Sequence, residues 1–346
     1  MRSTGPQKRN AFSTSSALST VVVTGASAGV GRAVALAFAE RGDRVALLAR
    51  GTAGLAAAAE DVRAAGGTPL AVPIDVADPE AVEQAADRIE AELGPIDIWV
   101  NNAMATMFAP ILEITPAEYR RATEVTYLGA VWGTMAALRR MRPRDRGVII
   151  QVGSALAYRA IPLQAPYCGA KHGLRGFTDA VRCELLHDKS RVAITMVHLP
   201  ALNTPQFSWG RSRMPRHPQP VPPSFQPEVA ARAVVAASEN PRREFWVGWP
   251  TIKAIVGNKI VPGLADRYLA RTGYDSQQMD EHGTARRYDN LFAPADEEQD
   301  FGPHGIFDDR ARPSSMMLKL TLHRRWLLLG SGVAAGAVAW IAARRA

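Results

Sequence analysis

The feature of this sequence that most limits its fold is a run of three valines followed at once by closely spaced glycines. Residues 21–23 predict a short buried strand, and Gly25, Gly29 and Gly31 leave the backbone bare where a helix begins. Such a turn directs free N–H groups and the positive end of the helix dipole at a phosphate. The start of the chain therefore predicts a strand-turn-helix unit that binds the phosphates of a nucleotide.

Apolar strands alternate with helical patterns along the rest of the chain. Helix starts are marked by Asp78 before Pro79, and by a capping box from Thr115 to Glu118. The predicted strands are residues 21–23, 45–48, 70–74, 96–100, 148–152, 192–198 and 244–248. We therefore expect an α/β fold, a Rossmann-type doubly wound parallel sheet of about seven strands, with ligands at the carboxyl ends of the strands.

Composition divides the 346 residues into one domain with extensions. The predicted segments are a disordered arm at 1–19, a catalytic domain at 20–270, an irregular polar extension at 271–317 and a hydrophobic helix at 318–346. Within the domain, residues 205–227 hold seven prolines and several aromatic side chains, which favours a substrate lid or else an ordinary surface loop. The arm is rich in Ser and Thr and lacks acidic residues, so a mitochondrial presequence is an alternative interpretation of this segment.

The C-terminal tail is the predicted membrane anchor. Residues 326–343 form an uncharged run of 18 between pairs of arginines, and a helix of that length reaches about 27 Å. We expect it to span a membrane with the catalytic domain on the cytoplasmic side; an interfacial helix and a soluble docking helix are the alternatives.

Charge and metal-binding residues exclude other function classes. The net charge of +8 fits an anionic cofactor and lipid head groups, while the lack of like-charge blocks argues against a nucleic-acid partner. Cys168 and Cys183 and the seven scattered histidines show no metal-ligand spacing, so we expect no metal site and no structural disulfide.

Tyr167 and Lys171 predict the chemistry. Four residues apart on one helix, they share a face, where the ammonium would lower the pKa of the phenol. A phenol tuned in this way is a usable general acid or base near neutral pH. Next to a nucleotide site, the pair predicts movement of a hydride together with a proton.

Four motifs in order, the glycine turn, Asn101-Asn102-Ala103, Ser154 and Tyr167-x-x-x-Lys171, make the chain resemble the short-chain dehydrogenase/reductase family over about residues 19–270. The resemblance implies an enzyme that interconverts a small-molecule carbonyl and a secondary alcohol, and a homo-oligomer. Ser154 would hydrogen-bond the substrate carbonyl, and Tyr167 would act as general acid/base. Lys171 would bind the nicotinamide ribose.

The resemblance also implies the cofactor contacts. Gly25, Ser27, Gly29 and Val30 would contact the adenosine phosphates and ribose, while Gly31 lets helix and strand approach. The remaining implied contacts are Asp75 to the adenine amino group, Asn101 and Ala103 along the adenosine ribose, Tyr167 and Lys171, and Thr204 near the nicotinamide carboxamide or pyrophosphate.

The end of the second predicted strand favours NADP(H) over NAD(H). NAD binders place a carboxylate there for the ribose hydroxyls, whereas a 2′-phosphate needs a cation. This chain has Arg50 at that place, and Arg32 stands nearby in the sequence of the first helix. Because a guanidinium can donate two parallel hydrogen bonds to a phosphate, we expect Arg50 to bind the 2′-phosphate.

Three positions depart from the family pattern. Thr126 replaces an asparagine that holds a proton-relay water, and its hydroxyl offers fewer hydrogen-bonding sites. Met104 and Ala201 each replace a glycine. We count Thr126 with Ser154, Tyr167 and Lys171 among the candidate catalytic residues. The alternative function is a catalytically weak, NADP(H)-responsive binding protein associated with a membrane.

Overall fold

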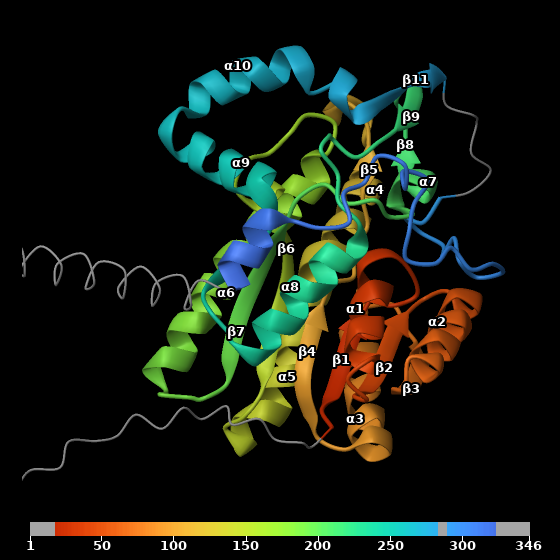
Figure 1. Ribbon diagram of the computed structural model, residues 1–346, viewed down its shortest axis with the longest axis vertical. Coiled ribbons are helices and arrows are strands. Elements are labelled where there is room, and N and C mark those ends of the chain that lie inside the picture. Colours follow the sequence, from red (N-terminus) through yellow and green to blue (C-terminus); the bar gives the residue numbers. More distant parts are fainter. Residues whose placement is uncertain (1–17, 283–288, 323–346) are drawn as a thin grey trace, which may run out of the picture.

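A seven-stranded parallel sheet forms the centre of the computed structural model, which describes residues 18–282 and 289–322. The strands run in the order β10-β7-β6-β4-β1-β2-β3 (Figure 1). Their bounds are β1 Thr20–Thr24, β2 Arg44–Ala49, β3 Thr68–Pro73, β4 Ile96–Asn101, β6 Val148–Ser154, β7 Ala193–Leu199 and β10 Glu244–Trp246. The predicted Rossmann-type sheet of seven strands is confirmed.

Helices cover both faces of this sheet, and the valine run shows why. Val21 and Val23 pack in one apolar cluster and Val22 in the other, because side chains alternate along a strand. A strand buried on both faces must be apolar throughout. One face carries α1 (Gly29–Ala39), α2 (Thr52–Ala64) and α8 (Pro227–Glu239); the other carries α3 (Pro79–Leu93), α5 (Gly129–Arg144) and α6 (Ala165–His187).

The strand order reverses beside β1, which lies between β4 and β2. The chain builds β1, β2 and β3 outward in one direction and then crosses back to place β4 on the other side of β1. At such a switch point the loops after neighbouring strands diverge and leave a crevice at the carboxyl ends. The glycine turn after β1 lies at that crevice.

Each of the seven predicted strands differs from the observed strand by one or two residues at one or both ends, as β3 and β10 illustrate. Strand β3 begins at Thr68, two residues before the predicted start, and ends at Pro73. Strand β10 stops at Trp246, because Gly248 with φ +78° begins helix α9 (Gly248–Ile260). Helix α9 is followed by α10 (Pro262–Thr272), so the predicted domain boundary at residue 270 falls inside a helix.

Residues 205–227 contain short packed elements that the sequence did not predict. They are α7 (Gln206–Trp209), β8 (Arg211–Ser212) and β9 (Arg216–Pro218). Strand β8 pairs with β5 (Met107–Phe108), and β9 pairs with β11 (Gln278–His282). Local sequence patterns did not predict these elements, because their strand partners lie about 100 residues before β8 and about 60 residues after β9.

The remaining elements connect the layers. Helix α4 (Pro116–Thr123) begins with the predicted capping box at Thr115 and runs through a π-helical turn, Glu124–Leu128, into α5. Three short 3₁₀ turns lie at Ile111–Glu113, Ala155–Ala157 and Asp275–Gln277.

The predicted polar extension is packed onto the domain. Residues 289–305, which we call the C-terminal segment, consist mainly of turns and bends, yet Leu291 within it and Phe307 just after it are buried. Figure 1 shows this segment in blue beside α7, near the end of the sheet where α2 begins. Hydrogen bonds to Trp209 of α7 and Ala53 of α2 fix it there.

The predicted membrane-spanning tail at 326–343 lies outside the described residues, as does nearly all of the predicted arm at 1–19. Across residues 18–282 and 289–322, no helix combines the length and the apolarity that a membrane crossing requires. The same residues contain no group of three or more His, Cys, Asp or Glu side chains placed to hold a metal ion.

Candidate active site

Two adjoining cavities lie at the carboxyl ends of the strands. The first, of about 150 Å³, is lined by the glycine turn and by the ends of β2 and β3. The second, of about 280 Å³, is lined by Ser154, Tyr167 and Lys171. Five residues line both cavities: Val30, Asn102, Met104, Thr204 and Gln206. The two therefore form one cleft with a polar, glycine-lined end and a largely apolar end.

The glycine turn forms the wall of the first cavity as predicted. Gly25 and Gly29 have φ of +65° and +57°, and a residue with a side chain would be strained in these backbone conformations. Ser27 and Val30 line the same cavity. Gly31 does not line it; a Cβ there would lie 2.0 Å from the Gly25 carbonyl oxygen, so this glycine lets α1 approach β1, the role expected from the sequence.

Asn101 does not reach the cleft, contrary to the sequence prediction. Its amide is buried behind β4, where it accepts from Trp99 Nε1 at 2.8 Å and donates to Thr134 Oγ1 at 3.0 Å. The neighbouring Asn102 lines the cleft instead and donates from Nδ2 to the Thr24 carbonyl at 2.9 Å. Alternation along the strand decides this, since consecutive side chains point to opposite faces. Ala103 lines the cavity as predicted.

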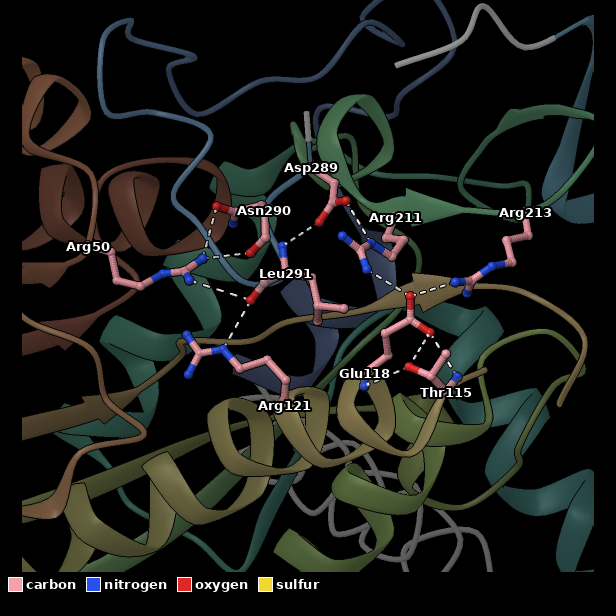
Figure 2. A network of polar contacts seen from close by, with 9 residues as sticks. All are labelled: Arg50, Thr115, Glu118, Arg121, Arg211, Arg213, Asp289, Asn290 and Leu291. Carbon is pink, nitrogen blue, oxygen red and sulfur yellow. Dashed lines mark hydrogen bonds and ion pairs between the residues drawn. The ribbon is translucent and has the colours of Figure 1, made fainter. Parts of the chain in front are cut away.

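The glycine-lined end of the cleft contains Arg50 and Asp75, both lining the first cavity. Asp75 accepts from the Ala77 N–H at 3.0 Å and pairs with Arg121 at 2.5 Å. Arg50 Nη1 donates to the Phe292 carbonyl at 2.8 Å. Its Nη2 donates to the Asn290 carbonyl at 2.6 Å (Figure 2). Burial lowers the pKa of Arg50. The C-terminal segment therefore already holds the guanidinium that sequence reasoning assigned to a phosphate.

Arg32 is not available to a phosphate, although its position in the sequence suggested it. Its guanidinium is buried and forms ion pairs with Asp61 of α2 and Asp300 of the C-terminal segment. The arginine thus links α1, α2 and the segment.

Ser154, Tyr167 and Lys171 meet in the second cavity, as the sequence predicted. Ser154 is the last residue of β6, while Tyr167 and Lys171 lie in the first two turns of α6. The Lys171 ammonium lies 5.6 Å from the centroid of the Tyr167 ring and donates to the Val152 carbonyl at 2.6 Å. Ser154 Oγ accepts from the Leu156 N–H at 3.1 Å.

Protonation in this group differs from the sequence prediction. Burial raises the pKa of the Tyr167 phenol, and a hydrogen bond with Ser154 lowers it only in part. Burial also lowers the pKa of Lys171 to about 8. In the protein alone the net shift of the tyrosine is therefore upward, opposite to the one predicted from the neighbouring ammonium. A raised pKa keeps the phenol protonated, the form that a proton donor needs.

Thr126, counted among the catalytic candidates, lies in the π-helical turn and is fully buried. Its hydroxyl donates to the Ala105 carbonyl at 2.9 Å and accepts from the Ala105 N–H at 2.9 Å. Neither cavity has Thr126 in its lining. The contacts are those of a side chain that holds the loop after β4 to the helix.

Replacing Thr126 with valine is therefore expected to lower the free energy of unfolding by about 1–3 kcal/mol, because two buried backbone groups lose their partner. Urea unfolding measures this, with Thr126→Ser as the control that keeps the hydroxyl. If the valine variant instead keeps the free energy of unfolding of the original protein and loses turnover, Thr126 takes part in proton transfer.

His198 and Glu244, which no sequence pattern singled out, lie behind Ser154. His198 of β7 is fully buried, and its Nδ1 lies 3.1 Å from the Ser154 carbonyl oxygen. Burial lowers the pKa of His198 to about 4, against the opposing charge of Glu244 at 3.7 Å. A lone histidine in a strand carries no spacing signal, so only the sheet register reveals that it faces the backbone of Ser154.

Comparison with known proteins agrees with this geometry. The family model described as short chain dehydrogenase matches residues 19–212. An uncharacterized oxidoreductase, YxnA of Bacillus subtilis, is 29% identical over 94% of this chain and 90% of its own length. An uncharacterized oxidoreductase of Mycobacterium bovis is 34% identical over 64% of this chain and 65% of its own. The crystal structure of a metagenomic short-chain oxidoreductase in complex with NADP superposes with a TM-score of 0.55 at 27% identity, over 67% of this chain and 96% of that one.

Proposed function

The chain belongs to the short-chain dehydrogenase/reductase family, whose enzymes act on CH–OH groups, and on that basis we propose that it reduces a lipophilic carbonyl with NADP(H). One observation carries the proposal. Ser154, Tyr167 and Lys171 line a cavity that shares five residues with the cavity beneath the glycine turn. A hydride donor bound along the first cavity and a carbonyl bound in the second would therefore meet beside Tyr167.

The first cavity fits a dinucleotide. A Cβ at Gly25 would lie 2.9 Å from Ala103 Cα, so a glycine is needed at this wall of the cavity, while the Gly25 and Gly29 N–H groups donate to the Leu48 and Gly302 carbonyls. Gly25, Ser27, Gly29 and Val30, which line the cavity, would contact the adenosine phosphates and ribose, and Thr204 the nicotinamide carboxamide or pyrophosphate. A bound reduced nicotinamide would supply the hydride to the carbonyl carbon.

The chain's own residues would complete the reaction. Ser154 donates a hydrogen bond to the carbonyl oxygen and orients it. Tyr167 transfers its phenolic proton to that oxygen, so that the carbonyl gains a hydride and a proton and becomes an alcohol. Lys171 is charged below about pH 8 and stabilises the phenolate that remains.

The lining of the second cavity supports a neutral, apolar substrate. Lys171 is the one charged side chain among the described residues that line it. The rest of the wall is mainly apolar: Leu156, Ile161, Phe207, Val221 and Pro220, Pro222, Pro223 and Pro250. Because Gln206, Phe207 and residues 219–223 contribute to it, we also propose that residues 205–227 act as the substrate lid.

A substrate panel tests the proposal. Oxidation of NADPH and of NADH by the full chain is followed with aliphatic ketones, aldehydes and lipid-derived carbonyls, and with α-keto acids as charged controls. We expect turnover with the apolar carbonyls and little with the keto acids, since burying a carboxylate in this cavity is costly. A preference for the keto acids would contradict the assignment.

The proposed preference for NADP(H) rests on Arg50. Arg50→Asp is expected to weaken NADPH binding by more than about 1.5 kcal/mol, the scale of one charge-assisted contact, and to improve NADH binding. Titration of each dinucleotide measures this, and Arg63→Asp, at an exposed arginine of α2, controls for the change in net charge. Unchanged NADPH affinity would show that another residue reads the phosphate.

We further propose that residues 326–343 anchor the protein to a membrane, with the catalytic domain on the cytoplasmic side, and that the protein is a homo-oligomer. Support within the described chain comes from α9, which borders the substrate cavity, and from α10. Together they expose the large apolar side chains Trp249, Ile260, Leu264 and Tyr268. Release of the full chain from membranes by a high-salt, alkaline wash would contradict a spanning anchor, and light scattering tests the oligomer.

A further inference from the structure

The C-terminal segment forms one wall of the first cavity. Asn290 and Asp296 line the first cavity together with Arg50. The backbone of the segment accepts hydrogen bonds from Arg50 and, at Leu291, from Arg121 of α4 at 3.0 Å (Figure 2). Through Asp289 the segment also binds Arg211 of the lid, which in turn binds Glu118 of α4. These contacts hold the segment at the cofactor site from several sides.

Asp296 lies against the start of α2, the helix that begins two residues after Arg50. Its carbonyl accepts from the Gly54 N–H at 3.1 Å. A Cβ on Gly51 would lie 2.0 Å from Asp296 Oδ1, and one on Gly54 would lie 2.6 Å from Oδ2. Two glycines thus make room for this carboxylate. Because α2 follows β2, this is the place where dinucleotide-binding folds read the adenosine ribose.

The Asp296 carboxylate is buried and incompletely hydrogen-bonded. The residue is 4% exposed, and Oδ2 has no hydrogen-bond partner among the described residues. Oδ2 lies against Gly54, whereas the residue as a whole lines the first cavity, where a bound ligand can supply donors to the carboxylate. The hydroxyls of an adenosine ribose are such donors, whereas a 2′-phosphate would bring a second negative group to the same place.

We propose that Asp296 belongs to the dinucleotide site, accepts a hydrogen bond from the adenosine ribose, and opposes the preference of Arg50 for a 2′-phosphate. This inference rests on the proposed function, because it takes the first cavity as the cofactor site. The carboxylate comes from a segment about 240 residues beyond Arg50 in sequence, instead of from the end of β2. Dinucleotide choice is then a balance between two residues of opposite charge.

Asp296→Asn tests the balance, since it removes the charge and keeps the shape. Dissociation constants for NADPH and NADH are measured by fluorescence titration without substrate. We expect the ratio of NADPH to NADH affinity to rise about tenfold or more, the scale of one charged contact. Glu297→Gln is the matched control, because Glu297 also bonds the start of α2 at Thr52 but does not line the cavity.

Gly51→Ala provides a second variant if Asp296→Asn folds poorly, because the added methyl would displace the Asp296 carboxylate. It is expected to raise the affinity ratio in the same direction. An unchanged ratio in both variants, with only a lower melting temperature, would show that Asp296 merely caps α2 and would overturn the proposal. Since binding is measured without turnover, this result is independent of whether Tyr167 catalyses the reaction.

Discussion

Tyr167→Phe is expected to lower kcat about a hundredfold or more while leaving NADPH affinity nearly unchanged. The substitution removes only the phenolic oxygen, the group that would give a proton to the substrate. The ring keeps its place in α6 beside Lys171, so the cavity wall stays intact. Initial rates with the best carbonyl of the panel, together with NADPH titration, measure the two effects separately.

Tyr158→Phe is the matched control for this experiment. The Tyr158 hydroxyl donates to Glu244 at 2.6 Å, and the residue does not line the substrate cavity. Its loss should cost stability but little turnover, since a partly buried hydrogen bond is lost away from the reacting atoms. Near-normal turnover in Tyr167→Phe would contradict the proposed mechanism and favour the catalytically weak binding protein.

The second large effect is expected from Gly31→Ala, which should abolish tight dinucleotide binding and lower the free energy of unfolding by about 1–3 kcal/mol or more. A methyl group there would lie 2.0 Å from the Gly25 carbonyl oxygen and 2.6 Å from Asn102 Nδ2. Neither group can move away easily, because the Gly25 carbonyl is part of the backbone and the Asn102 amide is hydrogen-bonded to the Thr24 carbonyl. Chemical unfolding and NADPH titration of the same preparation measure both effects.

Gly176→Ala is the control for this substitution, because it also replaces a helical glycine. Nothing lies within 4 Å of a Cβ at Gly176 in α6. Alanine there should stabilise the protein by about 1 kcal/mol, the difference in helix propensity. If Gly31→Ala behaved like Gly176→Ala, the close approach of α1 to β1 would not be needed for binding.

Local patterns predicted the sheet and the group of Ser154, Tyr167 and Lys171 that lines the second cavity, and missed what depends on distant contacts. The valine run and the glycine turn placed β1 and α1 correctly because both signals lie within a dozen residues. Tyr167 and Lys171 were found for the same reason, since helical periodicity fixes their common face. Asn101 was assigned to the cleft from the family resemblance, and the sequence alone did not fix which side of β4 faces the cleft.

The position of the C-terminal segment shows the larger limit of prediction from local sequence patterns. Its polar, proline- and glycine-containing sequence is typical of an irregular extension, and in backbone conformation it is one. What the sequence did not indicate is where the segment packs, because Arg50 and Asn290 are 240 positions apart. No local periodicity encodes such a contact. Thr126 is similar, since its bonds to Ala105 depend on how the loop after β4 meets the π-helical turn.

The hydrogen bond from Gly29 N–H to the Gly302 carbonyl has a consequence for how the protein is made on the ribosome. The strands of the sheet are complete once Trp246 has been synthesised, but Gly302 follows more than fifty residues later. At about 5–20 residues per second this is a delay of roughly 3–10 s. A nascent chain would thus hold all strands of the sheet before Gly29 gains its contact with Gly302, and the glycine-lined cavity would acquire this wall only after that delay.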